Sequence, residues 1–200
     1  MYYFLRMRYF YPNRPLLVSP DSKTVDEMDA NPNCVAEIKK NGDRLVLIKK
    51  DGQFTFYNRH RSVLKYQPIP AMLEELQSLN IPDGTQLDAE LMHNHTKNVK
   101  NLIYFYDIYV WGGDLMTEAF GIRRKQLEDL FFVGHDGQHL ELAKQYHSGF
   151  HQLFNEVIQN DEDEGLVMKN LKGELVFDRK KSVDVWWQVK VRRASKNSRI

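Results

Sequence analysis

The chain has 200 residues, 42% of them hydrophobic and 28% charged, with a formal net charge of +1. This length and composition are typical of an ordinary globular protein, and the near-neutral charge excludes a protein that is polybasic as a whole. No apolar run reaches the length of a membrane span, and the one cysteine, Cys34, excludes an internal disulfide. We therefore expect a single domain over residues 1–200, a monomer with no membrane partner, that is intracellular (cytoplasmic or nuclear) rather than secreted.

The first half of the chain is predicted to form strands joined by tight turns. Asp51-Gly52 gives a hairpin turn, because glycine accepts the positive φ that such turns need. Apolar residues between 72 and 79 recur at helical spacing after Pro70, which predicts a short helix. The other predicted elements are an extended lead-in over 12–20 and strands over 35–40, 45–50, 53–58, 86–92 and 102–110.

The second half contains two longer apolar patterns with helical spacing. They predict helices over 117–132 and 150–158, and shorter apolar runs predict strands over 165–169 and 185–191. Strands dominate and lack a regular alternation with helices, which argues against a doubly wound fold. We expect an α+β fold of antiparallel or mixed sheets packed by outer helices.

Basic residues gather toward the end of the chain. Between residues 169 and 200 there are ten basic residues and three acidic ones, and an acidic run over 161–164 comes just before. The basic end is either a footprint for a phosphate backbone or a solvated face, and charge alone leaves both interpretations open.

One lysine is placed as a nucleophile would be. Lys39 ends an apolar strand and lies three residues before Gly42 and five before Arg44. To attack a phosphate, its amine must be neutral, whereas an ordinary lysine has a pKa of about 10.4. A nearby cation disfavours the charged form, and Lys190 or a bound Mg²⁺ is the candidate for that role.

Six segments in a fixed order resemble the nucleotidyltransferase (adenylation) domain of the ATP-dependent DNA ligase superfamily, which also contains RNA ligases and mRNA capping guanylyltransferases. Each motif is weak by itself, but the ordered set runs from about Pro15 to Arg193 and is specific. The segments are Lys39-Lys40-Asn41-Gly42-Asp43-Arg44, Asn58-Arg59, Leu87-Asp88-Ala89-Glu90-Leu91, Tyr104-Phe105-Tyr106-Asp107-Ile108 with Arg123-Arg124, Glu164-Gly165-Leu166-Val167-Met168-Lys169, and Trp186-Trp187-Gln188-Val189-Lys190.

The resemblance implies an ATP-grasp-like fold and a catalytic Lys39 that forms a lysyl-AMP intermediate. It also implies ATP-binding roles for side chains spread over the other motifs. Arginine suits phosphate or ribose oxygens, because its guanidinium offers several fixed donors, and an aromatic face suits adenine. The expected contacts are phosphate or ribose for Arg44 and Arg59, the adenine face for Tyr106, the adenine amino group for Glu37, and the α-phosphate for Lys169 and Lys190.

Two carboxylates are the candidates for binding Mg²⁺ or Mn²⁺. Glu90 lies in an apolar strand, where a carboxylate costs free energy unless it is paired or bound to a metal. We expect it to contact the metal or a ribose hydroxyl. The carboxylate of Glu164 is expected to face the metal ion. The alternative is a solvated surface, because Glu164 also ends the acidic run.

The expected partner is nicked double-stranded DNA, with RNA as the alternative acceptor, for a ligase active in DNA repair, replication or recombination. Arg123, Arg124, Arg192 and Arg193 are expected to contact its phosphates, which predicts salt-sensitive binding that is indifferent to base sequence. The competing hypotheses are an RNA ligase, a capping guanylyltransferase, and a nucleic-acid-binding relative that has lost catalysis.

The motifs depart from the family pattern at three positions. Asn41 stands in place of the usual Asp, Ala89 in place of Gly, and Gln188 in place of the first lysine of the last motif. These departures motivate the hypothesis of a relative without catalysis. Members of the family usually continue into an OB domain, which we expect to be absent from this chain or supplied by a separate partner.

Overall fold

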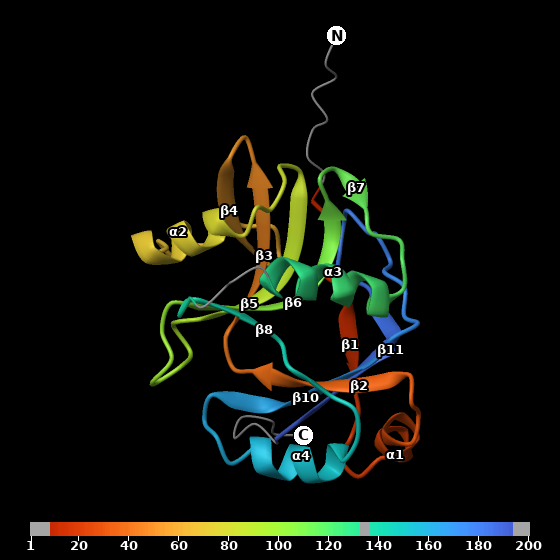
Figure 1. Ribbon diagram of the computed structural model, residues 1–200. Coiled ribbons are helices and arrows are strands. Elements are labelled where there is room, and N and C mark those ends of the chain that lie inside the picture. The colour runs from red at the N-terminus through yellow and green to blue at the C-terminus, as the bar shows by residue number, and fades with distance from the viewer. Residues whose placement is uncertain (1–8, 133–136, 194–200) are drawn as a thin grey trace.

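The fold consists of two β-sheets that lie one above the other (Figure 1). The structure is a computed structural model, and it describes residues 9–132 and 137–193. The five-stranded sheet has the order β1-β11-β10-β2-β9, and the six-stranded sheet has the order β4-β3-β5-β6-β7, with β8 paired to β6. The strands are β1 (Arg14–Leu17), β2 (Cys34–Lys40), β3 (Asp43–Lys50), β4 (Gln53–Asn58), β5 (Thr85–Met92), β6 (Leu102–Trp111), β7 (Asp114–Leu115), β8 (Leu140–Leu142), β9 (Gln145–Tyr146), β10 (Asp163–Asn170) and β11 (Asp184–Arg192).

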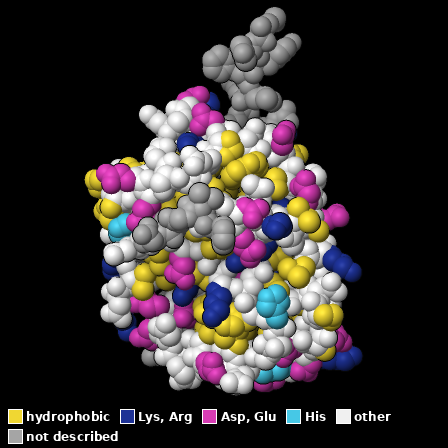
Figure 2. Space-filling view, in the orientation of Figure 1, with side chains coloured by type: hydrophobic (Ala, Val, Ile, Leu, Met, Phe, Trp, Pro, Cys, Tyr) yellow, Lys and Arg dark blue, Asp and Glu magenta, His cyan; other side chains and the backbone are white. Residues whose placement is uncertain are grey.

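Two helices pack on each sheet. Helices α2 (Pro70–Ser78) and α3 (Phe120–Phe132) cover the six-stranded sheet, and α1 (Lys23–Asp29) and α4 (Phe150–Val157) cover the five-stranded sheet. None of the helices in the described residues is long and apolar enough to cross a membrane. Acidic and basic side chains are interspersed on the face shown in Figure 2, as the near-neutral net charge leads one to expect.

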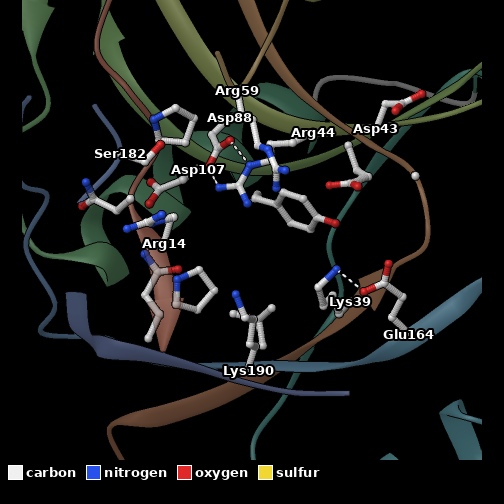
Figure 3. A pocket seen from close by; sticks show the side chains of 18 of the residues that line it. Arg14, Lys39, Asp43, Arg44, Arg59, Asp88, Asp107, Glu164, Ser182 and Lys190 are labelled. Carbon is white, nitrogen blue, oxygen red and sulfur yellow. Dashed lines mark hydrogen bonds and ion pairs between the residues drawn. The ribbon is translucent and has the colours of Figure 1, made fainter. Parts of the chain in front are cut away.

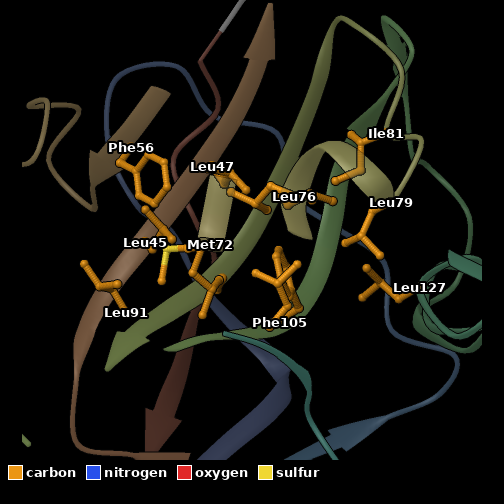
Figure 4. Packing of buried hydrophobic residues seen from close by; sticks show 14 of the residues in the cluster. Leu45, Leu47, Phe56, Met72, Leu76, Leu79, Ile81, Leu91, Phe105 and Leu127 are labelled. Carbon is orange, nitrogen blue, oxygen red and sulfur yellow. The ribbon is translucent and has the colours of Figure 1, made fainter. Parts of the chain in front are cut away.

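Strand alternation divides the six-stranded sheet into an apolar face and a polar face. On β5, Leu87, Ala89 and Leu91 enter the main core, while Asp88 and Glu90 point the other way. Figure 4 shows this core, where leucines of β3, α2 and α3 meet around Phe105. Burial of these side chains anchors the strands, so the polar face of the sheet has a fixed position.

The five-stranded sheet has a second, smaller core on its outer face. Ala36 of β2, Leu166 of β10 and Val189 of β11 pack there against Phe150 and Phe154 of α4. The opposite side chains of the same strands then face the six-stranded sheet. The polar faces of the two sheets therefore look toward each other.

The predicted α+β class and its mixed sheets are confirmed. Some of the observed elements differ from the predicted ones. The extended lead-in forms β1, and the helix predicted from residue 117 begins at Phe120. The apolar pattern does not predict α1, because only Val25 of its seven residues is buried. Strands β7, β8 and β9 have two or three residues each, too few to give a pattern in the sequence.

Candidate active site

A cleft of about 520 Å³ lies between the polar faces of the two sheets (Figure 3). Strands β3, β5 and β6 supply one wall, and β1, β10 and β11 supply side chains of the other. The cleft brings together residues that are far apart in the sequence. Of the predicted site residues, it is lined by Lys39, Arg44, Arg59, Glu90, Tyr106, Glu164, Lys169, Lys190 and Arg192.

Lys39 lies at the end of β2 and points its amine into the cleft. Its Nζ lies 2.6 Å from Oε2 of Glu164, and both side chains are about one quarter exposed. The strand pairing explains the contact, because Lys39 is opposite Gly165, the residue after Glu164. The pair is therefore partly shielded from water yet open to a ligand that enters the cleft.

Gly165 lets β10 and β11 approach closely beside this pair. Its φ is +151°, and a Cβ there would lie 2.1 Å from the carbonyl oxygen of Val191. A larger residue would therefore separate the strand that carries Glu164 from the strand that carries Lys190. The glycine of the Glu-Gly motif has a clear packing role in the geometry of the cleft.

In the acidic run before the basic end, only Asp161 is exposed, and the other three residues are buried or partly buried. Each of its four carboxylates has a partner among the described residues, and the run ties β10 to β2 and to the loop between β5 and β6. The pairs are Asp161 with Lys97, Glu162 with the backbone amides of Lys97 and Asn98, Asp163 with Lys40, and Glu164 with Lys39.

Arg44 is held in the cleft by a two-point contact with Asp88. Its Nε and Nη2 donate to the two carboxylate oxygens, and its guanidinium lies 5.5 Å from the ring centre of Tyr106. Burial raises the pKa of Asp88, and the charge of Arg44 opposes that rise. The pair fixes the guanidinium plane beside the aromatic ring.

Glu90 is nearly buried on the cleft side of β5. Burial raises its pKa to about 7, which Lys39 and Arg44 partly oppose, while the negative charge of Glu164 adds to the rise. Near neutral pH, protonated and ionised forms therefore coexist. A cation in the cleft would favour the ionised form, as the prediction of a metal contact requires.

A backbone irregularity in β6 turns two neighbouring side chains toward the cleft. Phe105 pairs with Ala89 and Asp107 pairs with Asp88, so Tyr106 is an extra residue between the two paired positions. Phe105 and Ile108 therefore enter the core, while Tyr106 and Asp107 both line the cleft. Burial also holds the pKa of Tyr106 well above its usual range, so its hydroxyl stays neutral.

Lys190 and Lys169 occupy different environments on the five-stranded sheet. Burial lowers the pKa of Lys190, and the positive charge of Lys39 lowers it further. Lys169 is almost fully buried, and its Nζ lies 2.6 Å from Oε2 of Glu37 and 4.5 Å from the ring centre of Phe120. Glu37 is fully buried and is not among the residues that line the cleft, and its expected contact with an adenine amino group stays a prediction.

The structure corrects the nucleic-acid role expected for Arg123. Its side chain is fully buried, and its Nε and Nη2 each lie 2.8 Å from a carboxylate oxygen of Asp107. Its Nη1 donates to the backbone carbonyls of Glu118 and Gly173. No phosphate can reach a guanidinium in this position. Through its contact with Asp107, Arg123 instead joins α3 to β6.

Arg124 is a second correction, for the same physical reason. Its side chain is 8% exposed, its Nε donates to Glu128 over 2.8 Å, and its Nη1 donates to the carbonyl oxygen of Ala143. The helix turns both arginines inward, where they complete the polar contacts of the core. The predicted phosphate contacts are wrong for both arginines, because their side chains are buried.

Of the other three basic residues predicted to bind a ligand or DNA, two line the cleft and one does not. Arg59 and Arg192 are exposed and line the cleft, and Nε of Arg59 lies 3.1 Å from Nε2 of His60. Arg193 is half-buried, and its Nη2 donates to the carbonyl oxygen of Asp161 over 3.1 Å. The end of the basic segment, with Lys196 and Arg199, lies outside the described residues.

Several residues that were not predicted as site residues also line the cleft. Asp88 could have been found, because strand alternation puts residues 88 and 90 on the same face. Arg14 gave no signal, since it precedes a proline in a segment predicted to be an extended lead-in. The additional lining residues with polar side chains are Asn13, Arg14, Asp43, Asn58, His60, Asp88, His95, Asp107, Ser182 and Gln188.

Within the described residues, no three His, Cys, Asp or Glu side chains are grouped closely enough to hold a metal ion. Glu90 and Glu164, the two residues expected near a metal, both line the cleft. Their carboxylate oxygens are ligands of the kind that Mg²⁺ prefers. The role of the pair in metal binding stays a prediction.

Solved structures of DNA ligases have a similar fold. The chain matches a Lig E DNA ligase with a TM-score of 0.57 and 15% identity, over 91% of this chain and 70% of that one. It matches mycobacterial DNA ligase D in complex with ATP with a TM-score of 0.61 and 15% identity, over 92% and 60% of the two chains.

Similarity in sequence points to the same group of proteins. The chain is 40% identical over 60 residues to the SPbeta prophage-derived DNA ligase-like protein LigB of Bacillus subtilis, which covers 30% of this chain and 20% of that protein. It is 24% identical over 188 residues to the DNA ligase of Methanococcus maripaludis, which covers 82% of this chain and 32% of that protein. No protein-family model matches the chain.

These findings confirm the predicted resemblance to the nucleotidyltransferase domain of the ATP-dependent DNA ligase superfamily. The matched regions span one fifth and about one third of the two curated relatives. The likeness therefore concerns the domain that carries the cleft.

Proposed function

We propose that the chain is the catalytic nucleotidyltransferase domain of an ATP-dependent DNA ligase. The observation that carries the proposal is the position of Lys39, whose amine faces a cleft that is also lined by Glu90, Arg44 and Lys190. This is the arrangement that a nucleophilic lysine needs, because cations beside it can hold the phosphates of the nucleotide that it attacks.

In the first step, the amine of Lys39 attacks the α-phosphorus of ATP. A phosphorus–nitrogen bond forms, the bond to the bridging oxygen breaks, and pyrophosphate leaves. The contact with Glu164 holds the amine at the cleft, and the amine loses its proton before or during the attack. Lys190 supports the step, because an ammonium group beside the cleft can stabilise negative charge that develops on the phosphate.

The nucleotide would lie across the cleft between the two sheets. Its base can stack on Tyr106, with Val167 of β10 lining the opposite wall. Arg44 and Arg59 would bind ribose or phosphate oxygens, and Lys169 could reach the α-phosphate only by leaving Glu37. Glu90 and Glu164 would hold Mg²⁺ or Mn²⁺, which neutralises part of the triphosphate charge.

The later steps would take place on nicked duplex DNA. AMP passes from Lys39 to a 5′-phosphate, and a 3′-hydroxyl then attacks that phosphate and releases AMP. Arg192, which lines the cleft, and the neighbouring Arg193 would contact the DNA backbone.

Two matched lysine variants test the proposed nucleophile. Lys39→Arg keeps a cation beside Glu164, and Lys40→Arg keeps a cation beside Asp163, which lies 3.0 Å from Lys40. We expect ATP labelled at the α-phosphate, with Mg²⁺, to label the wild-type protein and Lys40→Arg but not Lys39→Arg. Intact-mass measurement should show the added mass of one AMP.

Equal labelling of Lys39→Arg and the wild-type protein would show that Lys39 is not the nucleophile. Labelling by GTP instead of ATP would favour a capping guanylyltransferase. Sealing of nicked RNA in preference to nicked DNA would favour an RNA ligase. Binding of nucleic acid without any label would favour a relative that has lost catalysis.

A further inference from the structure

The cleft extends well beyond the group around Lys39 (Figure 3). Arg14 and Ser182 line its other end, and Lys190 lies between the two ends. The backbone amide of Arg14 donates to the carbonyl oxygen of Val183 over 2.8 Å, which holds Arg14 beside the loop that carries Ser182. Two side chains with hydrogen-bond donors therefore lie together, at a distance from the proposed nucleophile.

Arg14 is held in one orientation and still has a donor to spare. Its Nε and Nη2 lie 2.9 Å and 3.1 Å from the two carboxylate oxygens of Asp184, which fixes the guanidinium plane. Its Nη1 has no hydrogen-bond partner among the described residues, and its side chain is 56% exposed. The hydroxyl of Ser182 likewise forms no hydrogen bond within the part of the chain that the structure describes. Both groups can therefore donate to a ligand in the cleft.

The charges along the cleft indicate that this ligand is an anion. Burial lowers the pKa of Lys190, and the positive charges of Lys39 and Arg192 lower it further, a repulsion that a bound anion would relieve. Three carboxylates beside the cleft are already bound to arginines: Asp88 to Arg44, Asp107 to Arg123 and Asp184 to Arg14. Three cations that line the cleft form no ion pair with a described residue: Arg59, Lys190 and Arg192.

The geometry of the proposed first step gives the direction of the triphosphate. In-line attack requires the leaving oxygen to lie on the side of the α-phosphorus opposite the amine of Lys39. From an α-phosphate beside Lys39, the β- and γ-phosphates therefore extend away from that residue. In Figure 3 this direction leads past Lys190 toward Arg14.

We propose that Arg14 and Ser182 form a subsite for the pyrophosphate part of ATP, where both side chains donate to oxygens of the terminal phosphate. The inference rests on the proposed function and adds the residues that orient the leaving group. The reverse reaction depends on the same subsite. In that reaction, an oxygen of pyrophosphate attacks the phosphorus of lysyl-AMP, the phosphorus–nitrogen bond breaks, ATP forms and the amine of Lys39 takes up a proton.

Pyrophosphate binding to the Lys39→Arg variant tests the subsite without any chemistry. Calorimetric titration with pyrophosphate, and separately with orthophosphate, gives the affinities. Addition of Arg14→Ala should weaken pyrophosphate binding by about 5- to 30-fold, because a charge-assisted contact is lost at a half-exposed position. Ser182→Ala should weaken it less, and Arg14→Lys should recover part of the affinity because it keeps the charge.

Lys23→Ala is the matched control for loss of an exposed, paired cation. Lys23 lies on α1, contacts Glu27 over 3.1 Å and is not among the residues that line the cleft. Its replacement should leave the affinity for pyrophosphate unchanged.

Kinetics of the chain with Lys39 intact separate a pyrophosphate subsite from a DNA contact. Arg14→Ala should raise the KM for ATP in the labelling reaction. It should raise the pyrophosphate concentration needed to discharge preformed lysyl-AMP by a similar factor. Transfer of AMP from preformed lysyl-AMP to the 5′-phosphate of a nicked duplex should not change, because pyrophosphate has already left.

The inference is overturned if pyrophosphate does not bind, if it binds no more tightly than orthophosphate, or if Arg14→Ala changes its affinity by less than about twofold. Slower transfer of AMP to DNA by Arg14→Ala, with unchanged discharge by pyrophosphate, would also overturn it, because Arg14 would then be a DNA contact. Arg14-dependent binding of pyrophosphate without labelling by ATP would uphold the subsite and refute the proposed function. Labelling with Arg14-independent binding of pyrophosphate would do the reverse.

Discussion

Replacing Arg123 by methionine tests whether this arginine is a structural residue or a nucleic-acid contact. Methionine is similarly long and unbranched, so the main change is loss of the guanidinium. The substitution leaves Asp107 without the partner that binds both of its carboxylate oxygens. It also removes the guanidinium donor to the carbonyls of Glu118 and Gly173, of which the second keeps the backbone amide of Phe120.

The expected loss of stability is large. Breaking a buried ion pair by removing one partner costs about 3–5 kcal/mol, because the other charge stays buried. The whole free energy of unfolding of a domain is about 5–15 kcal/mol. For a chain of this length, each kcal/mol lowers the melting temperature by about 2–4 °C. Arg123→Met should therefore melt about 6–20 °C below the wild-type protein.

Urea unfolding followed by circular dichroism gives the free energies. Arg192→Met serves as the control, because Arg192 is exposed and its loss should change stability by less than about 0.5 kcal/mol. The double variant Arg123→Met with Asp107→Leu should recover part of the loss, since both buried charges are then gone. If Arg123→Met loses less than about 1 kcal/mol but binds nicked DNA poorly, our reasoning is refuted and the arginine is a phosphate contact.

The pKa of Glu90, raised to about 7 in the folded protein against 4.5 for an ordinary glutamate, predicts a pH dependence of stability. Between pH 4.5 and 7 the folded state binds more protons at Glu90 than the unfolded state does. The free energy of unfolding should therefore fall by up to about 3 kcal/mol from pH 4.5 to 7, and Glu90→Gln should remove this pH-dependent contribution. Urea unfolding at pH 5 and pH 7.5 measures it, and identical pH profiles of the two proteins would refute it. Gly165→Ala should cost more than about 2 kcal/mol and reduce labelling by ATP, because the new Cβ would collide with the backbone of β11. Gly52→Ala is the control, because Gly52 also has a positive φ but no atom lies near the position of its Cβ. This substitution should lower the free energy of unfolding by only about 1 kcal/mol and leave labelling by ATP intact. Equal losses in the two variants would contradict a packing role for Gly165.

Local patterns predicted much of the fold and the members of the cleft. Alternation on β5 and the order of the motifs indicated which strands carry polar residues, and Lys39, Glu90 and Lys190 do line one cleft. The pairings across the cleft could not be predicted, because they join strands that are distant in the sequence. Sequence spacing contains no information on which carboxylate a given cation will meet.

Two misjudged features illustrate this difference. The adjacent arginines 123 and 124 looked like a basic surface, but packing of α3 turned both side chains inward to meet Asp107 and Ala143. Tyr106 and Asp107 are neighbours in a strand and should face opposite ways, yet the irregularity in β6 brings both to the cleft. In each case, a contact with another element outweighed the local pattern.

The sequence by itself determined the periodicity of the strands, the ordered motifs and hence the class of the fold. These depend on short-range rules of side-chain alternation and turn chemistry. Only the tertiary structure decided which charges are buried, which are paired and which remain open to a ligand. The physical reason is that burial and pairing depend on distances between elements, and these are set only when both sheets have packed on their helices.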